Sequence, residues 1–199
     1  MKIEEWMEFF KKNRRKKIFS TSDLVLLTGC DRPSLSVALS RLVASNLIER
    51  PVRGLYVNPF NTPSDEELAM VIRDPSYLSL EYALSKHNIL SQNVFTYTLI
   101  TTKLPYSFST GDRVFEYHQV KRDLFWGYKT ERDVKTAEPE KALLDLIYIR
   151  TVRGRGNKNI LDSLMDDMYL DVLDKKKTAK YSKKYDTKTR EILSEKMLL

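Results

Sequence analysis

The side chains best suited to chemistry in this sequence are cationic, and many of them gather near its start. A basic run covers residues 11–17, and further arginines follow between residues 32 and 53. Lysine and arginine neutralise nucleic-acid phosphates, and small polar residues between them allow a helix to approach base edges. The pattern therefore predicts a DNA-binding surface. The residues predicted to contact DNA are Lys11, Lys12, Arg14, Arg15, Lys16, Lys17, Arg32, Ser34, Ser36, Ser40, Arg41, Arg50 and Arg53.

The elements that must position these cations are typical of a winged helix-turn-helix. The spacing of aromatic side chains in residues 3–12 predicts a first helix. A Ser or Thr at residues 20–21 can cap a second helix, which Gly29 ends in a left-handed conformation. Asp31 can cap a third helix, the predicted recognition helix. Residues 47–57 contain two β-prone stretches around a turn, which predict the wing.

The predicted recognition helix has two distinct faces. On its exposed face, Arg32 and Arg41 are the strong candidates for bidentate contacts to guanine. Much of the affinity should therefore come from phosphates, which residues 11–17, Arg50 and Arg53 are predicted to contact. A helical head that contacts protein instead of DNA is the alternative interpretation. The apolar face, which should pack inward, consists of Leu35, Leu39, Leu42 and Val43.

The formal net charge of +7 is unevenly distributed. Residues 1–59 contain 11 basic and 6 acidic side chains, residues 60–170 contain 14 and 16, and residues 171–199 contain 9 and 5. The excess of cations at the start favours an anionic partner there, with the tail as a second candidate. Two prolines and several turn-favouring residues in 57–65 indicate a boundary between domains of residues 1–59 and 65–199.

The larger domain is predicted to combine helices with a small antiparallel sheet. Ser79 is suited to cap one of its helices, and Asn88 to end that helix. The chain is thus predicted to be α+β: an N-terminal winged helix-turn-helix, then a C-terminal α+β domain with a small antiparallel sheet and flanking helices. Strands are predicted at residues 94–102, 113–117 and 119–126, and helices at residues 65–73, 77–88, 137–148, 160–172 and from Thr187 onward.

Several carboxylates could serve catalysis, but each has a structural interpretation. Three acids in residues 138–145 stand in the first turns of a predicted helix, where negative charge favours the helix dipole. Asp112, Asp133 and Lys135 superficially resemble the carboxylates and lysine of a metal-dependent nuclease. Such a triplet arises by chance in a chain with 31% charged residues, and Asp133 stands in a stretch more typical of a turn.

The remaining composition argues against an enzyme. Cys30 is the only cysteine and there are two histidines, so neither an intramolecular disulfide nor a structural zinc set is expected. Six glycines without a phosphate-loop pattern argue against nucleotide binding. We therefore predict no catalytic residues, no metal and no cofactor.

Hydropathy argues against a membrane partner. No apolar run approaches the ~18 residues of a membrane span, and acids in the first five residues are unlike a signal peptide. A cytoplasmic location is expected.

Short motifs follow one another along the chain in a specific order. They are Ser22-Asp23-Leu24, Thr28-Gly29, residues 50–56 with an Arg-Gly-x-Tyr core, residues 77–84, Thr101-Thr102, Gly111, Phe115-Glu116-Tyr117, Phe125-Trp126-Gly127 and residues 137–145. Together these motifs resemble the abortive-infection AbiEi antitoxin family over nearly the whole chain, and Pro-Glu-Lys-Ala-Leu-Leu-Asp at 139–145 is the best single marker. Asn88 stands where the family commonly has Gly, and Asn tolerates the same backbone region.

The resemblance implies an antitoxin of a type IV toxin–antitoxin system that acts in abortive infection, a phage defence. It implies that the head binds inverted repeats in its own promoter and represses the operon. It also implies that the C-terminal domain counters a nucleotidyltransferase-like toxin, with or without direct binding. The alternatives are a protein-binding inhibitor that does not bind DNA and a metal-dependent nuclease.

Overall fold

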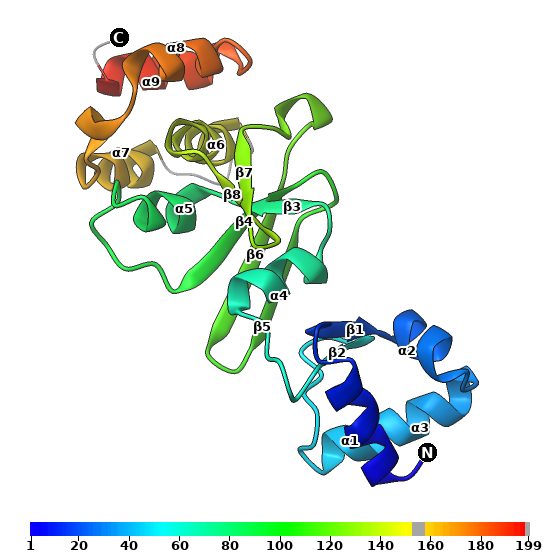
Figure 1. The fold of residues 1–199 in the computed structure, drawn as a ribbon. Coiled ribbons are helices and arrows are strands. Elements are labelled where there is room, and N and C mark those ends of the chain that lie inside the picture. The colour runs from blue at the N-terminus through cyan, green and yellow to red at the C-terminus, as the bar shows by residue number, and fades with distance from the viewer. Residues whose placement is uncertain (153–157, 198–199) are drawn as a thin grey trace. The chain divides into compact units, whose positions relative to one another are not determined.

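The computed structural model describes residues 1–152 and 158–197 of the 199-residue chain (Figure 1). The chain forms two compact units, Met1–Leu68 (unit 1) and Ala69–Leu199 (unit 2). The division falls inside helix α4 (Asp65–Ile72), so residues 60–64 and the start of this helix belong to unit 1.

Unit 1 consists of helices with one small sheet, in the order expected for a winged helix-turn-helix. Its elements before α4 are α1 (Ile3–Lys12), β1 (Ile18–Ser20), α2 (Thr21–Thr28), α3 (Arg32–Ala44) and β2 (Leu55–Val57). The predicted caps are confirmed. The Ser20 hydroxyl accepts a hydrogen bond from the Asp23 N–H at 3.0 Å, and Gly29 ends α2 at φ 67°. Asp31 caps α3 by accepting from the Ser34 N–H at 3.0 Å.

Aromatic and leucine side chains build the core of unit 1. Trp6 and Phe10 of α1 are buried, as the sequence predicts, and the Phe10 ring meets the Phe19 ring of β1 edge to face at 5.6 Å. Leu24 of α2 and Leu39 of α3 are fully buried against them. Since this core contains no residue of unit 2, α3 has its own rigid support.

The predicted wing hairpin within residues 47–57 is only partly right. Residues 55–57 form β2, but β2 pairs antiparallel with β1, with Ser20 opposite Leu55 and Ile18 opposite Val57. The stretch before the turn is not a strand and contributes one ladder-like bond, from the Val57 N–H to the Glu49 carbonyl at 2.9 Å. Leu47 is still tied to the end of α3 through the Leu42 carbonyl. Pro51 has no N–H to donate.

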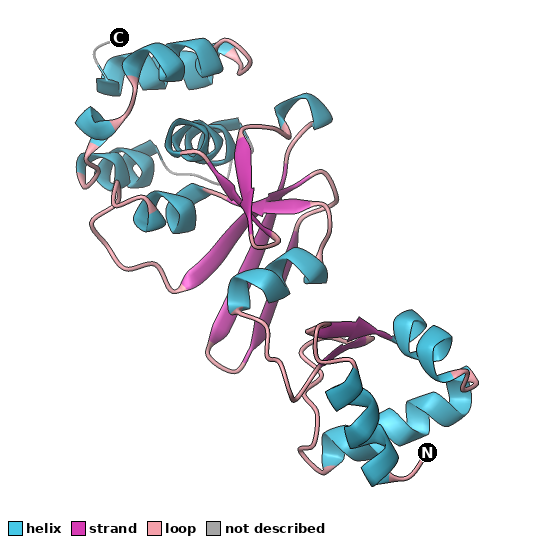
Figure 2. Ribbon diagram, in the orientation of Figure 1, coloured by secondary structure: helices cyan, strands magenta, loops and turns pink. Residues whose placement is uncertain are grey.

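Unit 2 is built around a six-stranded mixed sheet with the order β5-β6-β4-β3-β8-β7 (Figure 2). The prediction of a small antiparallel sheet is only partly right, because the sheet also has parallel pairs: β3 runs parallel to β8 and β4 runs parallel to β6. The chain reverses direction between β4 and β5 and again between β5 and β6. Strand β6 therefore runs parallel to β4. The strands are β3 (Ser76–Leu78), β4 (Thr96–Thr101), β5 (Tyr106–Thr110), β6 (Arg113–Gln119), β7 (Tyr128–Glu131) and β8 (Val134–Ala137).

The helices of unit 2 after α4 cover the sheet and one another. Helix α5 packs on β4, and α6 contacts α5, α7, α8 and α9. The α6 side chains Leu143, Leu146 and Ile147 are fully buried in the main core. These helices are α5 (Leu80–Lys86), α6 (Pro139–Val152), α7 (Lys158–Asp166), α8 (Lys175–Ser182) and α9 (Thr187–Met197).

Several sequence predictions for unit 2 need correction. The predicted helix 77–88 begins only at Leu80, because Tyr77 and Leu78 belong to β3 and pair with β4. The predicted strand 119–126 is wrong, since a short 3-10 helix at Arg122–Leu124 lies within it. The predicted helix 160–172 ends early, at Asp166. Asn88 does adopt the predicted left-handed conformation, at φ 56°.

Candidate nucleic-acid interface

Helix α3, the predicted recognition helix, exposes the face that the sequence predicts to contact DNA. Leu35, Leu39 and Leu42 are buried in the core of unit 1. The predicted contact residues of this helix, Arg32, Ser34, Ser36, Ser40 and Arg41, are all exposed. Neither arginine forms an ion pair with any residue that the structure describes. A cation without a protein partner is available for phosphate or guanine.

The turn before β2 carries the two wing arginines. Gly54 adopts φ 86°, a conformation that favours glycine, and its carbonyl accepts from the Thr21 N–H at 2.9 Å. This bond fixes the turn beside the N-terminus of α2. Arg50 and Arg53 are exposed, and within the described ranges neither meets a carboxylate. Two free cations thus lie next to the helix-turn-helix.

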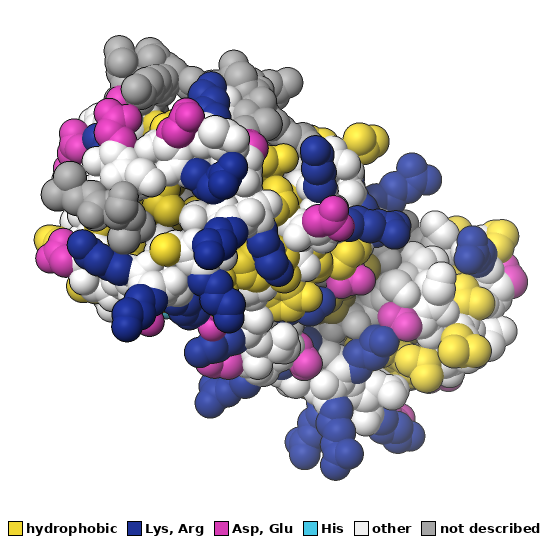
Figure 3. Space-filling view, turned by 90° about the horizontal axis from the view of Figure 1, so that it is seen from above, with side chains coloured by type: hydrophobic (Ala, Val, Ile, Leu, Met, Phe, Trp, Pro, Cys, Tyr) yellow, Lys and Arg dark blue, Asp and Glu magenta, His cyan; other side chains and the backbone are white. Residues whose placement is uncertain are grey.

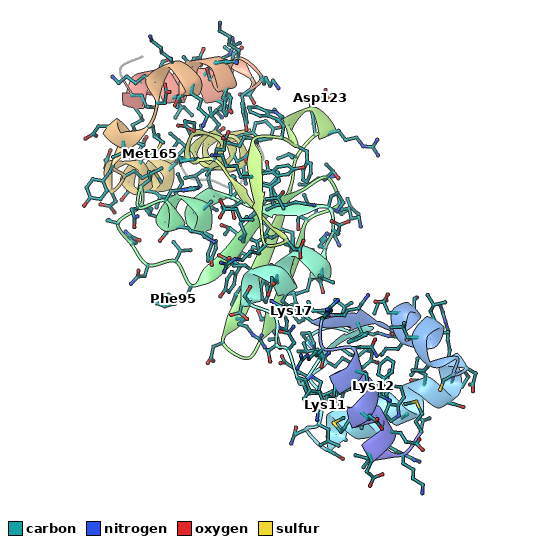
Figure 4. All side chains as sticks on the ribbon, in the orientation of Figure 1. Lys11, Lys12, Lys17, Phe95, Asp123 and Met165 are labelled. Atoms are coloured by element: carbon teal, nitrogen blue, oxygen red, sulfur yellow. The ribbon has the colours of Figure 1, made fainter. Side chains whose placement is uncertain are left out.

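The basic run at residues 11–17 is more heavily paired than the sequence suggests; Lys11, Lys12 and Lys17 of this run are labelled in Figure 4. Lys12 lies 3.0 Å from Glu8, Lys16 lies 3.1 Å from Asp23, and Lys17 lies 2.6 Å from Glu67. A lysine held by a carboxylate gains less from a phosphate, because one ion pair replaces another. The run's exposed cations without such a partner in the described chain are Lys11, Arg14 and Arg15.

The run also lies at the far end of the small sheet from the wing turn. It leads into Ile18, which pairs with Val57, while the turn is next to Ser20 at the other end of β1. The buried Asn58 fixes this geometry, since its amide donates to the carbonyls of Phe10, Asn13 and Lys16 at 3.0–3.2 Å. No periodic pattern in the sequence indicates this role of Asn58. The first cations of the run lie beside a shallow depression of about 630 Å³ lined by Met7, Glu8, Lys11, Lys12, Arg14 and Phe60.

Residues 175–182, in the basic tail, form helix α8, which the sequence did not predict as a helix. Its inner side is polar, with Thr178 and Ser182 buried, so no apolar stripe marks it. Figure 3 looks onto the end of unit 2 that α8 and α9 form and shows Lys and Arg side chains in groups there. Lys177 is paired with Glu138 at 3.3 Å and with Glu140 at 2.9 Å. These acids therefore attach α8 to the start of α6.

The most buried charges of unit 2 are an ion pair within α6. Asp145 and Lys141 are each 0% exposed and bond to each other. Asp145 also accepts from the hydroxyls of Tyr77 and Ser79 at 2.9 Å and of Tyr185 at 2.7 Å. Ser79 occupies the N-cap position of α5, but its side chain makes no cap bond, so its predicted capping role is wrong.

This buried cluster is satisfied and closed to solvent. Burial and the charge of Asp145 raise the pKa of Tyr77 and Tyr185 well above the ordinary tyrosine value. Burial lowers the pKa of Lys141, partly offset by Asp145. Every oxygen of the Asp145 carboxylate has a donor within the protein, so the cluster binds β3, α5, α6 and the segment after α8 together.

The residues that resembled a nuclease site do not come together. Asp112 lies in the turn between β5 and β6, and Asp133 lies in the turn between β7 and β8. These hairpins form opposite edges of the sheet, so at least three strand spacings, roughly 14 Å, separate them. Among the described residues, no group of three or more His, Cys, Asp or Glu side chains could hold a metal ion.

The pH dependence of α8 attachment follows from Glu138. Burial raises the pKa of this carboxyl, but the hydrogen bond from Tyr181 and the charge of Lys177 outweigh burial and hold the pKa below its ordinary value. A lowered folded-state pKa adds stability above the unfolded value, and this stability is lost as pH falls through the folded pKa. We therefore expect Glu138→Gln to reduce the fall in the free energy of unfolding between pH 6 and pH 3, measured by urea titration. The exposed Glu131→Gln is the control, and equal falls in the wild type and Glu138→Gln would contradict the expectation.

Unit 1 has a winged helix-turn-helix-like architecture, in which the second helix is exposed and the turn before β2 carries exposed arginines. Residues 10–59 match the family model described as "Transcriptional regulator, AbiEi antitoxin". This segment is therefore an AbiEi antitoxin transcriptional-regulator domain, which confirms the resemblance for unit 1. No curated protein matches the chain. Within residues 1–152 and 158–197, no helix has both the length and the hydropathy to cross a bilayer.

Proposed function

We propose that the chain is a type IV antitoxin that represses its own operon, with DNA binding in residues 1–59 and antitoxin action in residues 65–199. The observation that supports this most is the family match at residues 10–59, which covers the helix-turn-helix and wing. A transcriptional-regulator domain implies DNA binding. Inverted repeats in the promoter of its own operon are the proposed target.

The proposed binding mode places α3 in the major groove. Its exposed serines are small enough to let the helix approach the base edges, and Arg41 can reach guanine or a phosphate. Arg50 and Arg53 in the wing turn, with Arg14 and Arg15 at residues 11–17, would add phosphate contacts. The predicted contacts of Lys12, Lys16 and Lys17 would require release from their carboxylate partners.

The salt dependence of binding tests this mode. If about six phosphates are neutralised, the logarithm of the association constant should fall with the logarithm of salt concentration with a slope of about −5. Fluorescence anisotropy on a fragment of its own promoter measures this slope. Arg53→Ala should make the slope less steep by about 1. Affinity independent of salt would contradict the phosphate contacts.

For unit 2, we propose that it counters a toxin of the nucleotidyltransferase class. Its own core supports a separate task, since none of the residues in that core comes from unit 1. Co-expression of the full chain with the product of the adjacent gene tests the proposal, with growth as the readout. Relief of toxicity is expected. Absence of relief, with promoter binding intact, would show that the chain is a regulator only.

A further inference from the structure

On the recognition helix, the side chain that projects directly away from the core of unit 1 is apolar. At about 100° per residue, the buried residues Leu35, Leu39 and Leu42 share one side of α3, and Val37 projects almost directly opposite them. Val37 is 53% exposed. Ser34 and Ser36 lie on either side of Val37 around the helix. The side chain placed to enter a groove most deeply is therefore aliphatic.

Val37 has no structural use in unit 1 that accounts for its position. It is not part of the buried core or of the hydrophobic side chains packed against it. An exposed, β-branched residue is also a poor choice for a helix surface, since it loses side-chain freedom there. Contact with a molecule other than unit 1 accounts for an exposed valine at this position.

The chemistry of the major groove identifies what such a side chain would contact. Most groups on the base edges are hydrogen-bond donors or acceptors, and an aliphatic group set against them would leave them without partners. The exception is the 5-methyl group of thymine, which is apolar and faces the major groove. Contact between Val37 and this methyl group buries apolar surface on both sides.

We infer that Val37 is a specificity-determining residue that reads the 5-methyl group of a thymine in each operator half-site. The inference rests on the proposed DNA binding by unit 1. Arg41 follows Val37 by one helical turn on the same exposed side. It is therefore placed to contact a guanine or a phosphate next to the thymine that Val37 contacts. The operator should thus require an A·T pair at a position that no polar side chain of α3 needs to read.

Replacing thymine by uracil tests the inference, because uracil differs only in lacking the methyl group. The full chain is first used to select its preferred duplex from a random pool, and the selected duplex is then made with single uracils. Burial of one methyl group corresponds to roughly a fourfold change in affinity, so a single uracil at the sensitive position of one half-site should weaken binding by about three- to fivefold. Uracil outside the protected region should have no effect.

The decisive comparison is with Val37→Ala. This variant should bind the thymine duplex more weakly than the wild type and should show no further loss with uracil at the sensitive position. Val37→Thr, which keeps one methyl group, should retain part of the sensitivity. Val71→Ala removes an exposed valine from α4 and should leave the sensitivity unchanged.

The outcomes separate the inference from the function on which it rests. Equal affinity of the wild type for thymine and uracil duplexes would overturn the role of the methyl group while DNA binding stands. Undiminished uracil sensitivity in Val37→Ala would overturn the role of this residue. If selection enriches no sequence, the proposed DNA binding fails and the inference fails with it.

Discussion

Replacing Arg41 and Arg53 together by glutamate should weaken binding to the promoter by about 10²- to 10⁴-fold. Each arginine is exposed on a different element, α3 and the wing turn. Loss of one such contact costs roughly 1–3 kcal/mol, and the new negative charge adds repulsion from the phosphates. Since neither arginine has a partner in the described protein, the free energy of unfolding should change little.

Anisotropy measures the affinity of this double variant, and a promoter–reporter fusion measures repression. The control is Lys103→Glu with Lys121→Glu, which makes the same change in net charge on exposed residues of unit 2. The control should keep most of the affinity. An equal loss in both variants would show that binding follows net charge and not the placement of α3 and the wing.

The same double variant separates the two proposed activities. Relief of toxicity should persist, because the substitutions lie in unit 1 and leave the core of unit 2 unchanged. If the double variant still represses the promoter, the head does not bind DNA as proposed, and a pure protein-binding inhibitor becomes the better interpretation.

The predictable parts of unit 1 are those set by neighbouring residues. Caps and stops at Ser20, Gly29 and Asp31 act within a few positions of the chain, so sequence alone places α2 and α3. The wing depends on pairing between β1 and β2, which lie more than thirty residues apart. Strands of three residues carry too little alternation to reveal such a partner.

In unit 2 too, contacts between segments far apart in the sequence decide elements that local patterns do not predict. Tyr77 and Leu78 have the spacing of a helix, but pairing with β4 and β8 makes them part of a central strand. Helix α8 packs through Thr178 and Ser182, so its sequence resembles a solvated basic run. For the candidate interface, sequence alone predicted which residues of α3 are exposed. It could not show that Lys17 is held by Glu67, fifty residues away.

Breaking the buried ion pair of α6 should have the largest effect on stability. Lys141→Met keeps the volume of the side chain but leaves the Asp145 carboxylate charged and buried. Removing one partner of a buried pair costs about 3–5 kcal/mol. The Lys141 ammonium also lies 5.2–5.5 Å from the ring centroids of Tyr77, Trp126 and Tyr185, so the variant loses these contacts as well. Unit 2 should unfold at much lower denaturant concentration.

The chain offers matched controls for this result. Glu8 and Lys12 form an i, i+4 pair of the opposite order on the surface of α1, with the Lys12 and Glu8 side chains 73% and 64% exposed, and Lys12→Met should cost less than about 1 kcal/mol. Adding Asp145→Asn to Lys141→Met removes the unpaired charge and keeps one acceptor oxygen for the hydroxyls, so the double variant should be more stable than Lys141→Met.

Fluorescence can follow each unit in the same unfolding experiment, because Trp6 lies in unit 1 and Trp126 lies beside Lys141 in unit 2. Lys141→Met should lower the transition reported by Trp126, spare promoter binding and abolish relief of toxicity. Unchanged stability would show that the three hydroxyls satisfy Asp145 without the lysine. Loss of promoter binding together with unit 2 would show that the head depends on the rest of the chain, and would contradict the division of labour between the two units.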